Sequence, residues 1–524
     1  MLVSVDEAER KGTGLLARAH TFTIEGLHTR HVTVEVDIRA GLPAFTIVGL
    51  ADAAVREARE RVRTAILNSG YEFPARRITA NLAPGDIPKA GPGLDLALAC
   101  ALLAASGQLP GEPLESHALF GELALGGEVR ACQGTLAVAQ ATQDAGLGTL
   151  VLAGANAREA KLVEGVDVLV VERLSSAVRV LRGGPGDSPM QHVVEAPDAR
   201  GEQAPGPDLS EVRGQHHAVK ALVVAAAGGH NSLLSGPPGT GKTMLAQRIA
   251  SILPSLTRPE AIEVTRIHSI TGELAGGLAS ARPFRAPHHS ITTAGLVGGA
   301  RGRWVGELVL AHNGVLFLDE LSEFARPTLE ALRQPLEDGR VAVVRAHHSA
   351  VYPARFMLVA ATNPCPCGYA GDGERCRCTE SDMARHRRRL SGPLLDRLDV
   401  VTHLERDEAH DLHATPLTSS ERARERVTAA RERQAARLKD DGVAVNAHMD
   451  VRMLLKHVRL DANSEAMVRR ARETGLLSAR GQHRVLGVAR TIADLRGSER
   501  VQPRDVGAAL ALRPESGLEG SRAA

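Results

Sequence analysis

The eight residues from Gly236 to Thr243 have the types and the spacing of a phosphate-binding loop. They read Gly236-Pro237-Pro238-Gly239-Thr240-Gly241-Lys242-Thr243 and fit the pattern G-x-x-x-x-G-K-[ST]. In such a loop the glycines let backbone N–H groups surround phosphate oxygens, the lysine reaches the β- and γ-phosphates, and the hydroxyl is an Mg²⁺ ligand. We therefore expect the loop to bind ATP, with Mg²⁺ held through Thr243.

Two adjacent acids, Asp319 and Glu320, follow the apolar run Gly-Val-Leu-Phe-Leu at residues 314–318. A short, continuous apolar run is typical of a strand that is buried on both faces in a parallel sheet. A carboxylate at the end of such a strand suits the Mg²⁺ shell, and a second suits the polarisation of water. We assign these two roles to Asp319 and Glu320, respectively, and expect hydrolysis as well as binding.

A third polar residue, Asn363, follows the apolar run at residues 355–362. Its amide is suited to holding the attacking water or to sensing the γ-phosphate. An asparagine before a proline, here Pro364, is also a common turn residue, so the functional interpretation depends on the two motifs above.

These motifs need strands and helices that bring them together. Residues 230–235 read as a strand before the loop, and residues 244–250 have helical apolar spacing after it. The phosphates would then lie at a helix N-terminus, where the backbone N–H groups favour anions. Alternation of short apolar strands with helical patterns predicts an α/β fold.

Four of the six cysteines cluster just after Asn363, as Cys365, Cys367, Cys376 and Cys378. Paired thiols at short spacing in an intracellular protein favour metal binding over disulfides, and four thiolates can close a tetrahedral Zn²⁺ site. The spacing is C-x-C rather than the commoner C-x₂-C, so reduced thiols in a glycine-rich loop remain the alternative. Cys100 lies in an apolar run and is expected in the core, whereas the sequence identifies no partner for Cys132.

Further segments narrow the class of protein. They read RPFRAPHHS at residues 282–290, GELVLAHN at 306–313, LRQPLEDG at 332–339 and SGPLLDRLD at 391–399. The order of phosphate loop, acid pair and asparagine resembles the AAA+ ATPases, and these segments are similar to those of the magnesium-chelatase-like YifB/ComM family. The resemblance implies a P-loop NTPase core with a helical lid, in which Asn363 is sensor 1.

The same resemblance implies two catalytic arginines. Arg397 corresponds to an arginine finger that reaches the γ-phosphate of a neighbouring subunit, although an ion pair with Asp396 or Asp399 is the alternative. Arg480, in the first turn of a helix that resembles the sensor 2 helix, is preferred to Arg484 one turn later. A finger donated in trans requires a ring, so the resemblance implies a homo-hexamer.

Composition limits the class further. The chain has 524 residues, 43% of them hydrophobic and 24% charged, which suggests an ordinary globular protein of about three domains. The aromatic content of 2% argues against stacked aromatic platforms for single strands, and the net charge of +2 means that any basic surface is local. We find no leader pattern at the start and no apolar run of 18 residues, and expect a cytoplasmic protein with no membrane partner.

Two breaks in composition divide the chain. Residues 183–207 are rich in glycine, proline and acids and read as a linker. A weaker break falls near residues 407–420. We therefore expect an N-terminal domain at 1–182, an ATPase core at 208–406 and a C-terminal helical lid at 407–524.

Residues 1–182 alternate between strand and helix patterns and form an α/β domain, in which residues 121–130 resemble the Lon-protease-like domain. A Lon-type site uses a serine in G-P-S-A-G and an activating lysine. This chain has Gly93 at the serine position and Val138 at the lysine position. Without a hydroxyl and an amine there is no nucleophile to activate, so we do not expect proteolysis.

Two functions share such a motor. Residues 339–352 read as two short strands with a basic tip that carries Arg340, Arg345, His347 and His348, and a further basic cluster follows at Arg385, Arg387, Arg388 and Arg389. Such groups suit DNA backbones, although an arginine run is equally a solvated face. The resemblance implies a branch-migration helicase for natural transformation or recombination, acting on single-stranded or branched DNA. The alternative is a chelatase-like ATPase that remodels a protein partner.

Overall fold

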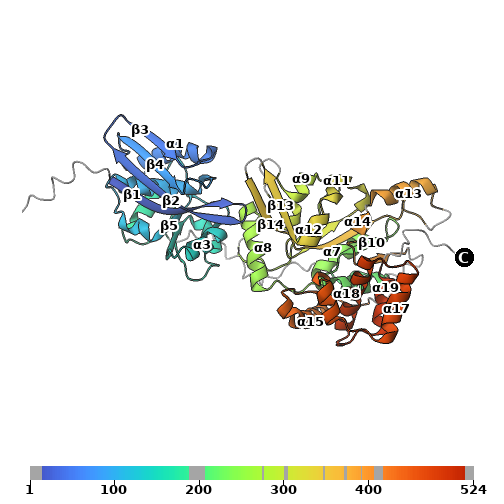
Figure 1. Ribbon diagram of the computed structural model, residues 1–524. Helices are drawn as coiled ribbons and strands as arrows, with labels where there is room; N and C mark the ends of the chain where they lie inside the picture. The colour runs from blue at the N-terminus through green and yellow to red at the C-terminus, as the bar shows by residue number, and fades with distance from the viewer. Residues whose placement is uncertain are drawn as a thin grey trace, which may run out of the picture. The chain divides into compact units, whose positions relative to one another are not determined.

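The computed structural model describes residues 15–187, 207–273, 277–299, 305–345, 348–370, 375–390, 392–405 and 417–513. The chain divides into two compact units (Figure 1). The first comprises Met1–Gly201 and Ala261–Ala279, and the second comprises Glu202–Glu260 and Ser280–Ala524. The segment 261–279 lies within the range expected for the ATPase core, but it belongs to the first unit.

The first unit is built on a mixed seven-stranded sheet of order β3-β4-β2-β1-β5-β8-β9. Its strands are β1 (Leu15–Glu25), β2 (His28–Arg39), β3 (Ala44–Val48), β4 (Arg77–Ala83), β5 (His117–Phe120), β8 (Thr149–Leu152) and β9 (Asp167–Val170). The pairs β1–β2 and β2–β4 are antiparallel, and the other neighbours are parallel. Strands β6 (Glu122–Leu123) and β7 (Val129–Arg130) form a separate short ribbon.

Helices pack on this sheet: α1 (Ala53–Asn68), α2 (Asp95–Ala105), α3 (Thr135–Asp144), α4 (Ala157–Ala160) and α5 (Leu174–Leu181). Helix α2 is almost entirely buried, because it is apolar on every side. Helix α8 (Arg258–Thr271) joins this unit from Ala261 onward, and the carbonyl of Ser269 accepts a hydrogen bond from the N–H of Gly134. The α/β character expected for this part of the chain is confirmed.

The second unit contains a parallel five-stranded sheet of order β11-β12-β15-β10-β16. Its strands are β11 (Phe284–Arg285), β12 (Val315–Leu318), β15 (Met357–Thr362), β10 (Ser232–Ser235) and β16 (Val400–His403). Every residue of β10, β12 and β15 is buried, as expected for parallel strands covered on both faces. Since the strands are parallel, their carboxyl ends meet at one edge, and the three predicted motifs follow β10, β12 and β15.

The core helices of this unit are α6 (His216–Gly228), α7 (Lys242–Ile252), α9 (Thr293–Val297), α10 (Glu307–Leu310), α11 (Arg326–Glu330), α12 (Arg333–Asp338), α13 (Glu380–Arg389) and α14 (Gly392–Leu395). The C-terminal part is helical: α15 (Ser420–Leu438), α16 (Val451–His457), α17 (Ala462–Glu473), α18 (Ala479–Leu495) and α19 (Pro503–Ala511).

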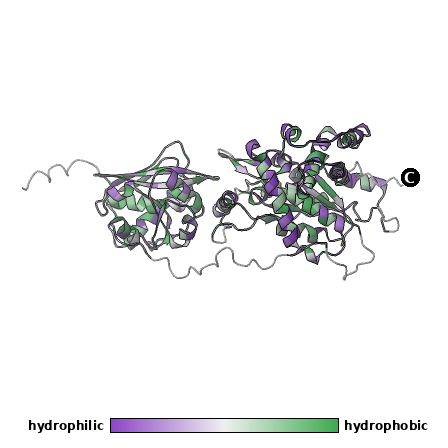
Figure 2. Cartoon of the chain, turned by 90° about the horizontal axis from the view of Figure 1, so that it is seen from below, coloured by the Kyte–Doolittle hydropathy of each residue, from purple (hydrophilic) through white to green (hydrophobic). Residues whose placement is uncertain are grey.

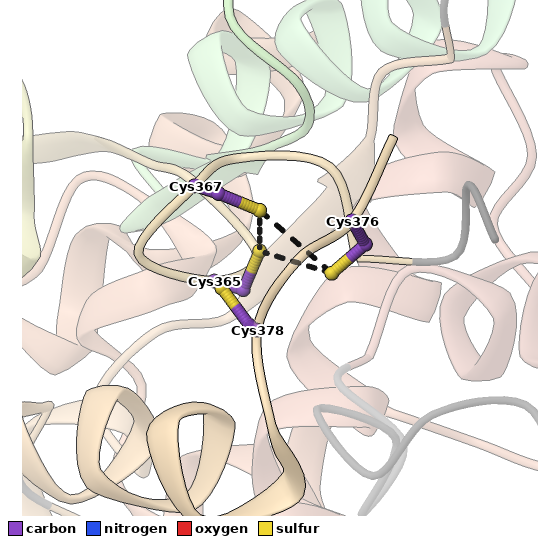
Figure 3. Close-up of side chains that lie close together, drawn as sticks. All are labelled: Cys365, Cys367, Cys376 and Cys378. Carbon is purple, nitrogen blue, oxygen red and sulfur yellow. Dashed lines mark hydrogen bonds between the residues drawn. The ribbon is translucent and has the colours of Figure 1, made fainter. Parts of the chain in front are cut away.

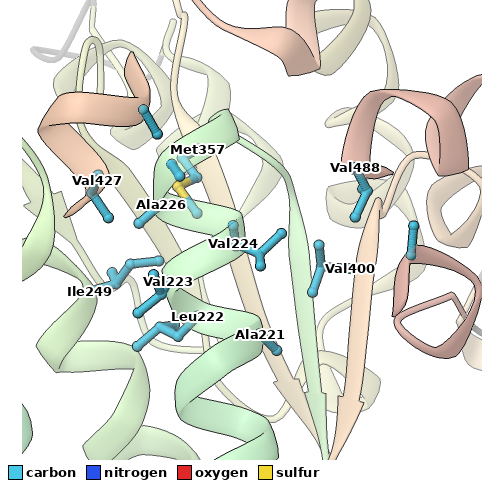
Figure 4. Close-up of a cluster of buried hydrophobic side chains, with 14 of the residues drawn as sticks. Ala221, Leu222, Val223, Val224, Ala226, Ile249, Met357, Val400, Val427 and Val488 are labelled. Atoms are coloured by element: carbon cyan, nitrogen blue, oxygen red, sulfur yellow. The ribbon is translucent and has the colours of Figure 1, made fainter. Parts of the chain in front are cut away.

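The helical C-terminal part shares one hydrophobic core with the sheet (Figure 4). Val223 of α6 and Ile249 of α7 belong to the same buried cluster as Val400 of β16, Val427 of α15 and Val488 of α18. Figure 2 shows hydrophobic residues concentrated in the interior of this unit and hydrophilic residues on its outer helices. The lid is therefore packed onto the nucleotide-binding core through apolar side chains.

The two strands expected after residue 339 are present as the hairpin β13 (Arg340–Arg345) and β14 (His348–Pro353). Val341 and Val343 point to its buried face, whereas Arg340 and Val344 are exposed. His347, at the expected basic tip, lies outside the described residues. In the part of the chain that the structure describes, no helix combines the length and the apolar character needed to cross a membrane.

Candidate nucleotide-binding site

The phosphate loop connects β10 to α7, in the strand–loop–helix context expected from the sequence. Gly239 and Gly241 have φ of 82° and 86°, in the left-handed region that favours glycine. Gly236 allows a close approach, because a Cβ there would lie 2.5 Å from the carbonyl oxygen of Leu404. Helix α7 begins at Lys242, and the first N–H groups of a helix have no intrahelical acceptor, which makes its N-terminus a usual environment for a bound phosphate.

Lys242 is 9% exposed. It donates to the carbonyls of Gly236 (2.7 Å) and Pro237 (2.8 Å) and to Asn363 Oδ1 (3.1 Å). Burial lowers the pKa of Lys242, while the charges of Asp319 and Glu320 act in the opposite direction. The ammonium group thus lies in a largely buried position suited to phosphate oxygens, and it joins the loop to the end of β15.

Thr243 and Asp319 are brought together as predicted. The Thr243 hydroxyl donates to Asp319 Oδ2 at 2.6 Å, across the gap between α7 and the end of β12. A hydroxyl and a carboxylate at this separation are the oxygen ligands that Mg²⁺ uses beside nucleotide phosphates. This donor set fits the cation that the sequence motif implies.

Glu320 has φ of 51° and a half-exposed side chain at the edge of the sheet. Its Oε2 lies 3.2 Å from Nδ1 of His289. His289 belongs to the histidine doublet of the 282–290 segment, and sequence reasoning missed its proximity to Glu320, because 31 residues separate the two. The sequence contained one indication that the 282–290 segment could matter, namely its similarity to a segment of the YifB/ComM family.

Asn363 begins the loop after β15, and both of its oxygens have partners. Its side-chain Oδ1 accepts from Lys242, and its carbonyl is 3.0 Å from Nε2 of the buried His386 on α13. Asn363 is therefore held from two sides, by the phosphate loop and by α13. The contribution of His386 could not be read from the sequence, since it depends on how α13 folds back.

Arg397 lies in the turn between α14 and β16 and is 8% exposed. Its guanidinium donates to the carbonyl of Pro393 and forms an ion pair with Glu337 of α12. The ion pair is thus with Glu337, and not with Asp396 or Asp399, the alternative partners considered from the sequence. The role of Arg397 as a finger stays a prediction.

The two arginines at the start of α18 differ in their surroundings. Arg480 is exposed in the first turn. Arg484 forms an ion pair with Asp399, with 3.1 Å between its Nη1 and Asp399 Oδ1, and Asp399 is 2% exposed directly before β16. Arg484 therefore ties the lid to the core, which leaves Arg480 as the better candidate for sensor 2.

The four clustered cysteines converge in the structure (Figure 3). Their sulfur atoms all lie within 4.8 Å of one another, although residues 371–374 between the two pairs lie outside the described part. Cys365 is fully buried and the other three are partly buried. Hydrogen bonds from backbone N–H groups, those of Tyr369 and Arg377, lower the pKa of Cys367 to about 6. Cys100 is buried in the first unit, as expected.

The second basic cluster lies on α13. Arg389 pairs with Glu323 at 3.3 Å, and Arg385 lies 3.9 Å from Asp382 one turn earlier. Arg388 is exposed. Part of this cluster is therefore engaged in surface ion pairs, as the solvated-face interpretation expects, and the hairpin is the better candidate for a DNA contact.

The first unit has no room for a nucleophile at the position that a Lon-type serine would occupy. A Cβ built on Gly93 would overlap the ring of Phe120, and Val138 is fully buried on α3. The geometry agrees with the expectation that this unit lacks protease chemistry at these positions.

A P-loop together with Asp319, Glu320 and Asn363 at one edge of a parallel sheet with a helical lid fits the class of AAA+ P-loop ATPases. Family models agree: the model "Magnesium chelatase, subunit ChlI" matches residues 208–412, "Subunit ChlI of Mg-chelatase" matches 34–156, and the ChlI C-terminal model matches 417–513. The resemblance found in the sequence is confirmed at this level.

Relatives give the particular family. The protein YifB of Escherichia coli is 42% identical over 504 residues, covering 95% of this chain and 97% of YifB. The competence protein ComM of Haemophilus influenzae is 40% identical over 502 residues, with coverage of 95% and 97%. The chain belongs to the YifB/ComM family of magnesium-chelatase-like AAA+ ATPases. A Holliday junction branch migration complex subunit, RuvB of Paenarthrobacter aurescens, is 29% identical over 233 residues, covering 42% of this chain and 48% of RuvB.

Proposed function

We propose that this protein is a ring-forming, ATP-driven DNA motor that moves branched DNA during natural transformation or recombination in the cytoplasm. The observation that carries the proposal is that the phosphate loop, Asp319, Glu320 and Asn363 lie together on the same unit as a hairpin that carries the exposed Arg340. The names of ComM and RuvB, which refer to competence and to Holliday junction branch migration, support the same direction.

ATP supplies the phosphoryl group whose transfer to water releases the energy for movement. In this chain, Lys242 and the loop N–H groups bind the phosphates, and Thr243 with Asp319 holds Mg²⁺. Glu320 accepts a proton from water, and Asn363 orients that water. Binding and proton transfer are therefore divided among residues that follow three neighbouring strands.

Two arginines complete the proposed site. Arg397 reaches the γ-phosphate of a neighbouring subunit once its ion pair with Glu337 opens, and Arg480 contacts the γ-phosphate from the lid. An arginine finger is worth about 10³–10⁵ in rate. The need for a second subunit leads us to propose a homo-hexamer.

The hairpin of β13 and β14 is the proposed DNA contact. Arg340 is exposed at its base, and Arg345 ends β13 beside His348. Arginines on a hairpin suit the phosphate backbone, which gives binding without sequence preference and with strong salt dependence. The low aromatic content is consistent with backbone contacts rather than base stacking.

The test is an ATPase assay with no DNA and with single-stranded, duplex, forked and four-way-junction DNA. We expect branched DNA to stimulate turnover, and binding to weaken as salt rises. The double variant Arg340→Ala, Arg345→Ala should lose the stimulation while keeping DNA-independent turnover. The dependence of its DNA affinity on salt should also weaken, with the magnitude of the slope of log affinity against log salt lower by about 1–2. Arg422→Ala, an exposed arginine on α15, is the matched control and should behave as the wild type.

No stimulation and no salt-sensitive binding with any of these DNAs would refute the motor proposal. Normal DNA-independent turnover in that case would favour the alternative, a chelatase-like ATPase that remodels a protein partner. The family models named for a chelatase subunit are the observation behind that alternative.

A further inference from the structure

The sulfur atoms of the cysteine cluster (Cys365, Cys367, Cys376 and Cys378) have the spacing of a tetrahedral metal centre. The Cys365 sulfur lies 3.4 Å from that of Cys367 and 3.9 Å from that of Cys376, and the last two are 3.7 Å apart (Figure 3). A Zn²⁺ ion bound to four thiolates at about 2.3 Å requires sulfur separations of about 3.8 Å. Three of the six sulfur separations are therefore close to the value for a Zn²⁺ site, and the Cys378 sulfur lies within 4.8 Å of the other three.

The loop that carries these cysteines packs directly on the phosphate loop. Gly368 has φ of 87°, and a Cβ there would lie 2.6 Å from Cδ of Pro238 and 3.8 Å from Cγ of Asn363. Cys365 is two residues after Asn363, and its side chain is fully buried. The cysteine loop is thus the layer that covers sensor 1 and one side of the phosphate loop.

The other end of the cluster is also tied to sensor 1. Cys378 immediately precedes Thr379, whose side chain caps α13 in a capping box with Asp382. Further along α13, His386 contacts the carbonyl of Asn363. The chain therefore leaves the nucleotide site at Asn363, passes through the cysteine cluster and returns to Asn363 through α13.

We propose that the cysteine cluster binds one structural Zn²⁺ and that this ion fixes Asn363 against the phosphate loop. As the ion binds, the thiol groups release their protons to solvent and become thiolate ligands. All four ligand positions are filled by protein, so the centre is closed and has no open position for catalysis. The coupling to ATP turnover rests on the proposed role of Asn363, whereas the metal site stands on the sulfur geometry alone.

The metal site is tested on the full chain purified without chelator. Elemental analysis should find about one zinc per chain, and titration after denaturation should find all six cysteines as thiols. The double variant Cys376→Ser, Cys378→Ser should lose the zinc, whereas Cys132→Ser, a partly buried cysteine of the first unit, should keep it. Replacement by Co²⁺ should give the charge-transfer and d–d absorption bands of tetrahedral thiolate coordination.

The coupling is tested on wild-type protein, which avoids any folding defect of the variants. Stripping zinc with a chelator should lower kcat for ATP at least about fivefold while nucleotide binding is retained, and added Zn²⁺ should restore kcat. Circular dichroism before and after stripping checks that the protein remains folded.

Each outcome decides one part. Zinc content as low in the wild type as in the double variant, or a cysteine pair found oxidised, would overturn the metal site. Stoichiometric zinc whose removal leaves kcat unchanged in the folded protein would overturn the coupling. A wild type that binds zinc but hydrolyses no ATP would instead refute the proposed ATPase roles and, with them, the coupling, while the metal site would stand.

Discussion

At the residue scale, Glu320 is held in an unusual conformation at the functional edge of the sheet. Its φ of 51° places a non-glycine residue in the left-handed region, which costs about 1–3 kcal/mol and is found mainly at functional positions. His289 lies 3.2 Å from its carboxylate. The backbone conformation and His289 together restrict the orientation of the Glu320 side chain. A restricted orientation suits the proposed role of Glu320, which is to accept a proton from one water molecule.

We expect Glu320→Gln to lower ATP turnover by at least about 100-fold and to leave ATP binding intact, because the amide keeps the shape but cannot accept the proton. Phosphate release and binding of a fluorescent ATP analogue measure the two effects separately. Lys242→Ala is the comparison variant and should weaken both, since its Nζ is the ammonium group of the phosphate loop. Normal turnover of Glu320→Gln would show that another group is the base.

The sequence predicted the residues that follow neighbouring parallel strands, and it did so for a physical reason. Asp319 and Asn363 directly follow strand ends, Lys242 follows the loop after β10, and a strand end can be recognised from its apolar run. His289, Glu337 and His386 could not be found in that way, since each contacts its partner across 23 to 60 residues of sequence. Such pairings depend on the tertiary path of a segment, for which the local pattern carries no information.

At the element scale, the joint between α18 and β16 depends on one buried charge. Asp399 is 2% exposed; its Oδ2 accepts a hydrogen bond from the N–H of Asn231 at 3.0 Å, and its Oδ1 forms an ion pair with Arg484 at 3.1 Å. Burial raises the pKa of Asp399, but the contacts with His230 and Arg484 outweigh burial, so the pKa lies below its ordinary value. The lid helix is therefore fixed to the sheet by electrostatics as well as by the shared apolar core.

We expect Arg484→Ala to destabilise the protein by about 3 kcal/mol, because it leaves Asp399 buried without its cation. Thermal unfolding should show a fall in Tm of about 6–12 °C. The pKa of Asp399 is lowered in the folded state, so this stabilisation is complete above the unfolded value of about 4 and is lost as the pH falls through the folded value. The difference in Tm between the wild type and Arg484→Ala should therefore become smaller at acid pH.

The exposed Arg480, one turn earlier on α18, is the matched control for this effect. Arg480→Ala should change the stability by less than about 0.5 kcal/mol and should instead lower ATP turnover. Equal losses of stability in the two variants would contradict the assignment of Arg484 to structure and Arg480 to the nucleotide.

At the scale of the whole molecule, the chain is made of two units, each with its own sheet and hydrophobic core. The second unit carries every residue proposed for ATP hydrolysis, yet Arg397 pairs with Glu337 instead of with a residue of the site. Within one chain, Arg397, the proposed finger, is therefore not in contact with the proposed site. If Arg397 acts on the neighbouring subunit, the ATPase activity of one subunit depends on Arg397 of the next.

We expect Arg397→Ala and Glu320→Gln to be inactive separately and to recover part of the ATPase activity when mixed. In a mixed ring, some sites combine an intact Glu320 with an intact Arg397 from the neighbour. Phosphate release against the mixing ratio measures the effect. A mixture that stays inactive, although exchange of subunits is shown by labelled protein, would place Arg397 outside the shared site.

The Phe120 ring lies so close to Gly93 that it limits which side chains position 93 of the first unit can accept. A serine introduced at position 93 would collide with the Phe120 ring, and the buried Val138 supplies no amine. At least three substitutions would have to occur together before any peptide bond was cut, and each one alone would harm packing or add nothing. A Ser–Lys pair at these two positions would therefore require the packing around Phe120 to change together with both side chains, so no single substitution creates it.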